Sequence, residues 1–516
     1  MVFRPQVLIA AALFSAVAAR AQAPAQAPTP ERSHVERFST IETRAERVEA
    51  DADKKLAADP RDAAALNSRG VARLFLGRYK EAAEDLARAV AIKPDSPDYQ
   101  ANLGSALWKV GRAEEAVAAE RAALKLDDKN YSAHYQLGRF LMRLGGRERL
   151  TEAVAHLRRA VEIDPRQYDV RFELIAAYRA LGDRAQASNQ LDFLADARPS
   201  DPRVFYTSAL LATDRDDMEA ALRDFKEAIR RDPAFFSAWQ DLGVAYMKLR
   251  RWNDAVETFA EFARLRPDAV DAAYLHALAL FNAGRVEDSE REVRRALRLN
   301  AGAAEAHTLL GVILASRGTA NAEAADALSQ AAALNPNSFD AHFYLGRVLY
   351  AQKDTAGAVR ELRAAAALDP RHAEARFFLG TALEAAGDSA AALAEYAELV
   401  KLDPQSVFGL VGQGALFVKQ GKLDDAVAAL NRAAALDPKN FEARLALGRA
   451  QALAGRYAEA VVQLQAATAI APYRADAHYQ LGLALRRLGR DEDAKREFDT
   501  VDRLNTEFRT GAATRQ

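Results

Sequence analysis

The chain has 516 residues, half of them apolar, a formal net charge of −1 and no cysteine. A charge this close to zero gives no bulk electrostatic attraction to DNA, RNA or anionic membranes, so we expect no nucleic-acid partner. The lack of cysteine excludes disulfides, thiol nucleophiles and zinc–cysteine sites from every part of the sequence.

The beginning of the chain reads differently from the rest. Arg4 precedes the apolar run Val7–Ala19, and residues 21–23 (Ala-Gln-Ala) fit a small-x-small cleavage site. This pattern predicts a secretory signal peptide over residues 1–23. The apolar run is shorter than the roughly 20 residues of a membrane span, so we expect no transmembrane span in the mature chain. We therefore expect export, to the bacterial periplasm; the alternative is anchoring to the inner membrane by an uncleaved N-terminal segment.

Two segments separate this leader from the main body of the chain. Residues 24–33 are rich in proline and alanine and predict an extended linker. Residues 34–62 predict a charged helix that ends at Asp59-Pro60. Because Pro60 is in phase with the prolines that follow, this helix is interpreted as an N-terminal cap or a degenerate half-repeat.

A spacing of 34 residues governs the main body of the chain. Ten of twelve steps between marker residues, which are small except for Ile175, equal 34, and the other two are 37 and 35. The markers are Gly70, Gly104, Gly138, Ile175, Ala209, Gly243, Ala277, Gly311, Gly346, Gly380, Gly414, Gly448 and Gly482. A proline series keeps the same phase: Pro60, Pro94, Pro165, Pro199, Pro233, Pro267, Pro336, Pro370, Pro404, Pro438 and Pro472. Two independent markers in one phase indicate tandem repeats.

Each repeat predicts a pair of helices. In residues 443–472, two apolar stretches at helical spacing flank the break at Gly455-Arg456, and the second stretch stops before Pro472. Proline lacks an amide hydrogen and its ring clashes with the preceding helical turn, so it ends each unit. Gly448 and Ala460 are expected where two antiparallel helices approach closely.

These residues resemble the tetratricopeptide repeat (TPR) family. The shared pattern is a Leu-Gly pair in the first helix, as in Leu447-Gly448, then an alanine such as Ala460, a bulky residue such as Leu464 and a final proline. Thirteen units cover residues 63–508, with a polar terminal helix from Asp491 and a tail at 509–516. The resemblance implies an all-α fold, a right-handed α–α superhelical solenoid of tandem helix pairs.

A search for catalytic chemistry finds no site. The sequence has no Gly-rich phosphate loop, no His-Glu-x-x-His and no Gly-x-Ser-x-Gly motif. Half of the histidines share one position, four residues before the marker: His134, His307, His342 and His478. They recur because the repeat recurs, so packing is preferred over metal ligation. We expect no enzyme activity, no cofactor and no metal site.

The resemblance places the first helices on a concave groove that binds partner peptides. The residue three positions before the marker would point into it, and seven aromatic residues occupy that position: Tyr135, Phe172, Tyr206, Tyr274, Phe343, Phe377 and Tyr479. They are interpreted either as a track for an extended peptide or as packing between adjacent first helices. Arg139, Arg347 and Arg449, one position after the marker, are candidates to bind carboxylates.

Two insertions interrupt the period. Gly145–Arg149 includes three extra residues between the two helices of the third unit, and Arg317–Ala322 lengthens a later turn by one. Taken together, the sequence predicts a non-catalytic scaffold of the cell envelope that binds protein partners along the groove. The alternative is a soluble receptor for one exported peptide or glycan; the identity of the partner is unknown.

Overall fold

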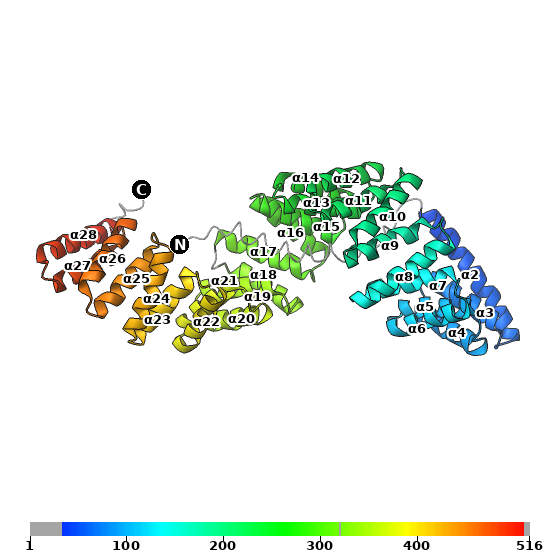
Figure 1. Cartoon of the computed structure of the whole chain (residues 1–516), viewed down its shortest axis with the longest axis horizontal. Coiled ribbons are helices and arrows are strands. Elements are labelled where there is room, and N and C mark those ends of the chain that lie inside the picture. The colour runs from blue at the N-terminus through cyan, green and yellow to red at the C-terminus, as the bar shows by residue number, and fades with distance from the viewer. Residues whose placement is uncertain (1–33, 319–320, 510–516) are drawn as a thin grey trace. The chain divides into compact units, whose positions relative to one another are not determined.

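A computed structural model describes residues 34–318 and 321–509 of the chain. These residues form 27 helices, α2–α28, and no strand (Figure 1). The expectation of an all-α repeat fold is therefore confirmed. The predicted signal peptide and linker (residues 1–33) and the tail after Arg509 lie outside the described residues.

The described residues divide into two compact units, which we call the N-terminal unit (34–283) and the C-terminal unit (284–509). The N-terminal unit comprises α2 (His34–Ala58), α3 (Ala63–Phe75), α4 (Tyr79–Ile92), α5 (Pro97–Lys109), α6 (Ala113–Leu126), α7 (Tyr131–Leu144), α8 (Arg147–Ile163), α9 (Tyr168–Leu181), α10 (Arg184–Ala197), α11 (Pro202–Asp214), α12 (Met218–Arg231), α13 (Phe236–Lys248), α14 (Trp252–Leu265) and α15 (Val270–Asn282).

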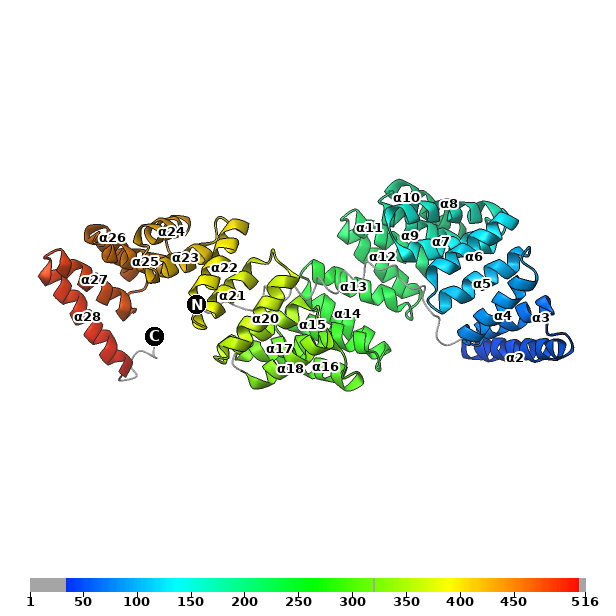
Figure 2. The same cartoon turned by 90° about the horizontal axis from the view of Figure 1, so that it is seen from below.

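The C-terminal unit comprises α16 (Val286–Leu299), α17 (Ala304–Arg317), α18 (Ala322–Leu334), α19 (Phe339–Ala351), α20 (Thr355–Leu368), α21 (Ala373–Ala385), α22 (Ser389–Leu402), α23 (Val407–Lys419), α24 (Leu423–Leu436), α25 (Phe441–Leu453), α26 (Tyr457–Ile470), α27 (Ala475–Arg487) and α28 (Asp491–Arg509). Within each unit, helices that follow one another in the chain lie side by side (Figure 2). From α3 on, odd-numbered helices are the first helices of the repeats and even-numbered helices are the second.

The pair α25 and α26 shows how the sequence forms one repeat. Asn440 caps the first helix by accepting a hydrogen bond from the Ala443 N–H. Gly455 turns the chain with a φ of 76°, a conformation that residues with a Cβ rarely adopt. The second helix ends at Ile470, two residues before Pro472.

The marker glycines allow the two helices of a repeat to touch. A Cβ added to Gly448 would lie 2.5 Å from Cγ of Leu464, and one added to Gly414 would lie 2.4 Å from Cγ of Leu430. Both leucines are fully buried. One side of each first helix is thereby fixed against its second helix, which leaves the opposite side for contacts with neighbouring first helices and with ligands.

One second helix departs from this apolar packing. In α6 the position opposite the marker glycine holds Glu120, which is 0% exposed. A Cβ on Gly104 would lie 2.7 Å from its Oε1, and neither carboxylate oxygen has a hydrogen-bond partner among the described residues. Burial raises the pKa of Glu120 to about 9, so the side chain is neutral at pH 7.

The three extra residues of the third repeat fold differently from the sequence expectation. Helix α8 begins at Arg147 and has 17 residues, whereas α6 has 14. Arg147–Arg149 therefore lengthen the second helix, and only Gly145 and Gly146, both with positive φ, form the turn. In the eighth repeat, α17 ends at Arg317 and α18 begins at Ala322.

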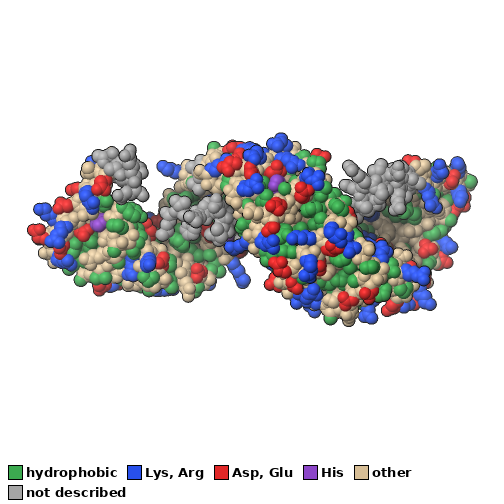
Figure 3. All heavy atoms as spheres, turned by 90° about the horizontal axis from the view of Figure 1, so that it is seen from above, with side chains coloured by type: hydrophobic (Ala, Val, Ile, Leu, Met, Phe, Trp, Pro, Cys, Tyr) green, Lys and Arg blue, Asp and Glu red, His purple; other side chains and the backbone are tan. Residues whose placement is uncertain are grey.

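The helices at the two ends of the array cover its apolar surface. Ala52 and Leu56 of α2 are buried in one cluster with Leu66 of α3. Ala494 of α28 is 2% exposed, and Phe498 packs against the backbone of Gly482. On the face shown in Figure 3, Lys and Arg side chains lie among Asp and Glu side chains, as the near-zero net charge suggests.

Candidate binding groove

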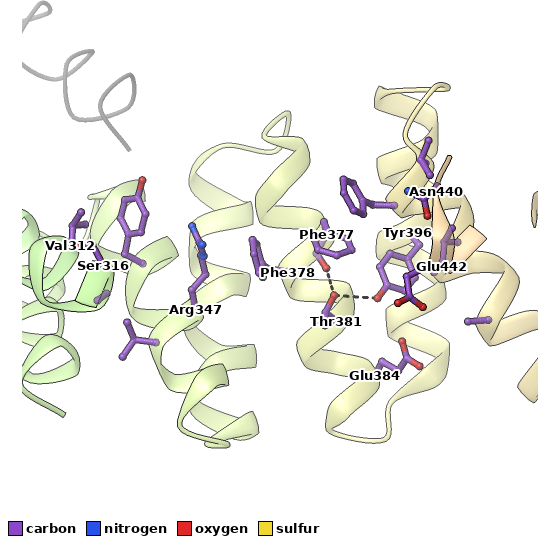
Figure 4. A pocket seen from close by; sticks show the side chains of 18 of the residues that line it. Val312, Ser316, Arg347, Phe377, Phe378, Thr381, Glu384, Tyr396, Asn440 and Glu442 are labelled. Atoms are coloured by element: carbon purple, nitrogen blue, oxygen red, sulfur yellow. Dashed lines mark hydrogen bonds between the residues drawn. The ribbon is translucent and has the colours of Figure 1, made fainter. Parts of the chain in front are cut away.

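A cavity of about 790 Å³ opens on the first helices of the C-terminal unit. Its lining comes from α17, α19, α21, α23 and α25, with one residue from a second helix, Tyr396 of α22. The volume falls in the range of roughly 300–1,000 Å³ that is typical of ligand pockets. Figure 4 shows side chains of consecutive first helices along this cavity, which we call the groove pocket.

An aromatic cluster forms one wall of the groove pocket. The ring of Phe377 lies 5.4 Å from that of Phe378 and 5.3 Å from that of Phe408, centroid to centroid. Phe408 is 39% exposed, a high value for a phenylalanine. Since water-exposed aromatic surface is favourable to cover, this wall is well suited to bind an apolar partner.

Tyr396 and Gly412 form another part of the lining. Tyr396 is only 2% exposed, and a Cβ on Gly412 would lie 2.7 Å from its ring. Its hydroxyl lies 3.3 Å from Oγ1 of Thr381, which itself donates to the backbone carbonyl of Phe377 (Figure 4). Burial raises the pKa of Tyr396 to about 12, so this phenol stays neutral at physiological pH.

The charged side chains that line the groove pocket are paired within the chain. Arg347 lies 3.7 Å from Glu374 and places its guanidinium 4.6 Å from the ring centre of Phe378. Glu384 pairs with Lys419, and Glu442 lies 3.3 Å from Arg474. Arg317 pairs with Glu290 at 2.6 Å. The groove pocket therefore offers no uncompensated charge to a ligand.

The structure distributes the seven predicted aromatic residues over four environments. Tyr206 and Phe343 are 8% and 3% exposed, which corresponds to packing between helices. Phe377 lines the groove pocket. The half-buried ones are Tyr135, Phe172 and Tyr274, and Tyr479 is 47% exposed beside Phe498.

Both the hydroxyl and the ring of the buried Tyr206 contact other residues of the N-terminal unit. Its hydroxyl donates to Oδ2 of Asp241 at 2.7 Å, and its ring lies 4.8 Å from that of Phe235. Burial raises the pKa of Asp241 to about 6. This side chain joins α11 to α13 within the N-terminal unit.

The three predicted arginines also differ. Arg347 lines the groove pocket. Arg139 lies 3.3 Å from Glu173 and 5.3 Å from the ring centre of Tyr135, beside a cavity of about 110 Å³ that Trp108 and Phe140 help to line. Arg449 is exposed on α25. Their role in binding a partner carboxylate stays a prediction.

Several residues of the groove pocket were missed by the sequence analysis. Tyr344, Phe378 and Gly412 lie two positions before successive markers, and Thr381 and Ala415 lie one position after. The sequence carried a signal at the first of these positions. Two consecutive repeats have an aromatic residue there, and the third has glycine.

The histidines make contacts within the chain. His342 and His478 each pair with a glutamate of the following second helix, and His307 lies 2.9 Å from the carbonyl of Ala301. Nδ1 of His134 lies 3.0 Å from Nδ1 of His156. Among the residues described, no group of three or more His, Cys, Asp or Glu side chains is placed to hold a metal ion. In the same part of the chain, no helix has the length and apolarity to span a membrane.

Comparison with known families agrees with the repeat pattern. The family model described as Tetratricopeptide repeat matches residues 102–168, 240–293, 274–321, 320–362, 354–407 and 411–475. Further models described as Tetratricopeptide repeat match residues 146–211 and 475–508, and one described as TPR repeat matches 75–111.

Individual proteins share less with the chain. A curated relative, the TPR repeat-containing thioredoxin TTL4 of Arabidopsis thaliana, is 34% identical over 94 residues, which is 18% of this chain and 14% of that protein. The structure of YrrB, described as a TPR protein with an unusual peptide-binding site, is 23% identical with a TM-score of 0.34 and covers 36% of this chain and 96% of its own. A chain of the APC/C hetero-tetramer Cut9-Hcn1 is 13% identical with a TM-score of 0.39. The match covers 87% of the present chain and 94% of that chain.

Proposed function

Because the chain belongs to the tetratricopeptide repeat family, we propose that it is a non-catalytic scaffold of the cell envelope that binds protein partners along its first helices. The observation that carries this proposal is the groove pocket, an apolar cavity of about 790 Å³ on five successive first helices. Repeat arrays of this kind present extended surfaces on which several side chains act together.

The envelope location is part of the proposal and rests on the sequence. Arg4, the apolar run Val7–Ala19 and the small residues at 21–23 support export to the periplasm, with inner-membrane anchoring as the alternative. A fusion of residues 1–23 to a periplasmic reporter tests this part. The reporter is active and the leader is removed if the proposal holds; a reporter that stays inactive in the cytoplasm contradicts it.

A second candidate is a soluble receptor for one exported ligand. The groove pocket supports a receptor because its apolar surface is confined to a few helices of the C-terminal unit. The glycan version of this alternative has less support, because the charged groups around the cavity are already paired within the chain. A peptide is therefore the better candidate ligand for a receptor.

Photo-crosslinking in the native envelope distinguishes these functions. A photoreactive amino acid at Phe408 reports on the groove pocket, and one at Phe75, a 70% exposed phenylalanine of α3, serves as the matched control. A scaffold gives crosslinks to a defined set of envelope proteins from Phe408. Crosslinks to one small peptide support the receptor, and the same products from both positions contradict both functions.

A further inference from the structure

We propose that the groove pocket binds an amphipathic α-helix of a partner protein through the helix's uncharged apolar face. This proposal rests on the proposed function and specifies the chemistry of the partner. It follows from three properties of the cavity, namely its apolar surface, the state of its polar groups and the pairing of its charges.

The first property is an apolar surface that spans several helices. Phe377, Phe378 and Phe408 are supplied by α21 and α23, and Val312 and Val411 extend the apolar lining along α17 and α23. A cavity of about 790 Å³ fits a drug-sized ligand, which is more than one side chain. The occupant must therefore insert several apolar side chains at once.

Gly412 contributes to the size of this surface. The two preceding repeats carry Tyr344 and Phe378 at the equivalent position. Gly412 has no side chain, and even a Cβ at this position would lie 2.7 Å from the Tyr396 ring. The result is a local widening where the array otherwise has an aromatic side chain.

The second property concerns hydrogen bonds. The Ser316 hydroxyl donates to the carbonyl of Ile313, Thr381 donates to the carbonyl of Phe377, and Asn440 caps α25. Among the uncharged polar side chains that line the cavity, only the Tyr344 hydroxyl makes no hydrogen bond within the described residues. The remaining polar side chains of the lining are charged and form ion pairs within the chain, so few groups are left to satisfy the backbone of an extended segment.

This shortage decides between an extended peptide and a helix. A buried backbone N–H or C=O without a partner is strongly unfavourable, and an extended chain brings one donor and one acceptor per residue. A helix satisfies these groups internally and presents apolar side chains at i, i+3, i+4 and i+7 to a groove. The lining of the groove pocket therefore fits a helix better than a strand.

The third property is charge. Arg347, Glu384 and Glu442 are each paired with an oppositely charged side chain of this chain. A charged residue on the inserted face would have to break such a pair or be buried without one, which is unfavourable. The face that enters the groove pocket is therefore uncharged.

Two peptides of identical composition test the helical mode. Both are labelled, Ala-rich and about 20 residues long, because shorter isolated helices are marginal in water. The helical peptide carries two Phe and two Leu at i, i+3, i+4 and i+7, and the alternating peptide carries them at every second position, as on one face of a strand. Fluorescence anisotropy with the full-length mature chain gives both affinities. We expect the helical peptide to bind at least tenfold more tightly.

A variant of the protein localises the binding. Ala415→Arg places a charged side chain in the groove pocket at a position where Arg347 and Arg449 show that the helix accepts arginine. The matched control is Ala176→Arg, at the same repeat position of the N-terminal unit and half-buried like Ala415. We expect at least a tenfold loss of affinity for the helical peptide with Ala415→Arg and no change with Ala176→Arg.

A second pair of variants removes surface instead of adding charge. Phe408→Ala deletes the exposed part of the aromatic wall, and Phe75→Ala is its control. The helical peptide should lose affinity severalfold with Phe408→Ala alone. Because Phe408 is partly exposed, this truncation leaves the fold intact, which circular dichroism verifies.

Four results would overturn the proposal. They are tighter binding of the alternating peptide, no binding of the helical peptide, binding that survives Ala415→Arg, and a concentration-dependent dimer of the chain itself that Ala415→Arg dissociates, which would make a second copy the occupant. The proposed function fails separately, when crosslinking from Phe408 captures no envelope protein. A captured partner whose peptides bind only in extended form would retain the function and reject the helix.

Discussion

Replacing the buried Glu120 by leucine is expected to stabilise the protein. The side chain is fully buried without a hydrogen-bond partner, at the position where the first repeat has Leu86 and the third has Leu157, both against a marker glycine. Leucine fits that contact in several repeats of the array. Glu120→Leu therefore removes an unsatisfied buried carboxyl and gives the second repeat the leucine–glycine contact that the first and third repeats have.

The expected gain follows from the protonation that folding requires. At pH 7 an unfolded chain ionises Glu120, whose ordinary pKa is 4.5, while the folded chain holds it neutral with a pKa of about 9. At pH 7 the unfolded carboxylate lies about 2.5 pH units above its pKa, and each unit is worth about 1.36 kcal/mol. Protonating this carboxyl on folding therefore costs about 3 kcal/mol. We expect Glu120→Leu to recover roughly this amount at pH 7, in addition to any gain from apolar burial.

The stability contributed by Glu120 should fall as the pH rises. A folded pKa above the unfolded value means that the stability is fully present below pH 4.5 and is lost as the pH rises toward 9. Opening of α5 and α6 should therefore become easier between pH 5 and 8 in the natural chain but not in Glu120→Leu. Hydrogen exchange followed by mass spectrometry, corrected for intrinsic exchange rates, measures this opening.

Glu120→Gln is the matched control, because it has the same shape and cannot ionise. It should lose the pH dependence while keeping an unsatisfied polar group, so its stability at pH 7 should lie between those of the natural chain and Glu120→Leu. Easier opening of Glu120→Leu than of the natural chain at pH 7, or one pH profile shared by all three proteins, would show that Glu120 is not a destabilising buried carboxyl.

Three further predictions concern other parts of the array. Burial lowers the pKa values of His134 and His156, so their contribution to stability is fully present above the ordinary pKa of 6.5 and is lost as the pH falls below it. Hydrogen exchange in α7 and α8, corrected for intrinsic exchange rates, should therefore show easier local opening at pH 5 than at pH 7, and His156→Gln should reduce that difference. Leu464→Ala leaves a cavity beside Gly448 and should cost about 2–5 kcal/mol, measured by urea unfolding of the full chain. Gly455→Ala, at a φ of 76°, should cost about 1 kcal/mol in the same assay, and an unchanged midpoint would show that this turn relaxes freely.

The helix pairs were predictable because the information that forms them is local and repeated. The break at Gly455-Arg456 and the stop before Pro472 lie where α25 ends and α26 begins and ends. The close approach at Gly448 follows from the lack of a Cβ. The extra residues at Arg147–Arg149 were harder to place, because the same insertion can lengthen either a turn or a helix.

The groove pocket was only partly predictable. Phe377 and Arg347 were identified from their repeat positions. Phe343 occupies the same repeat position as Phe377 and is nevertheless buried, so the register alone does not determine which aromatic residue faces the cavity. The pocket depends on side chains from five first helices, on the absence of a side chain at Gly412 and on Tyr396 of a second helix. Such a meeting of distant positions requires the three-dimensional structure.

Co-purification of the mature chain from its native envelope fraction tests directly whether the groove pocket holds a protein partner. The natural chain, Ala415→Arg and Ala176→Arg should be compared at equal abundance. We expect a defined set of envelope proteins with the natural chain and with Ala176→Arg, and loss of at least one of them with Ala415→Arg. Recovery of the same proteins with all three chains would contradict this expectation.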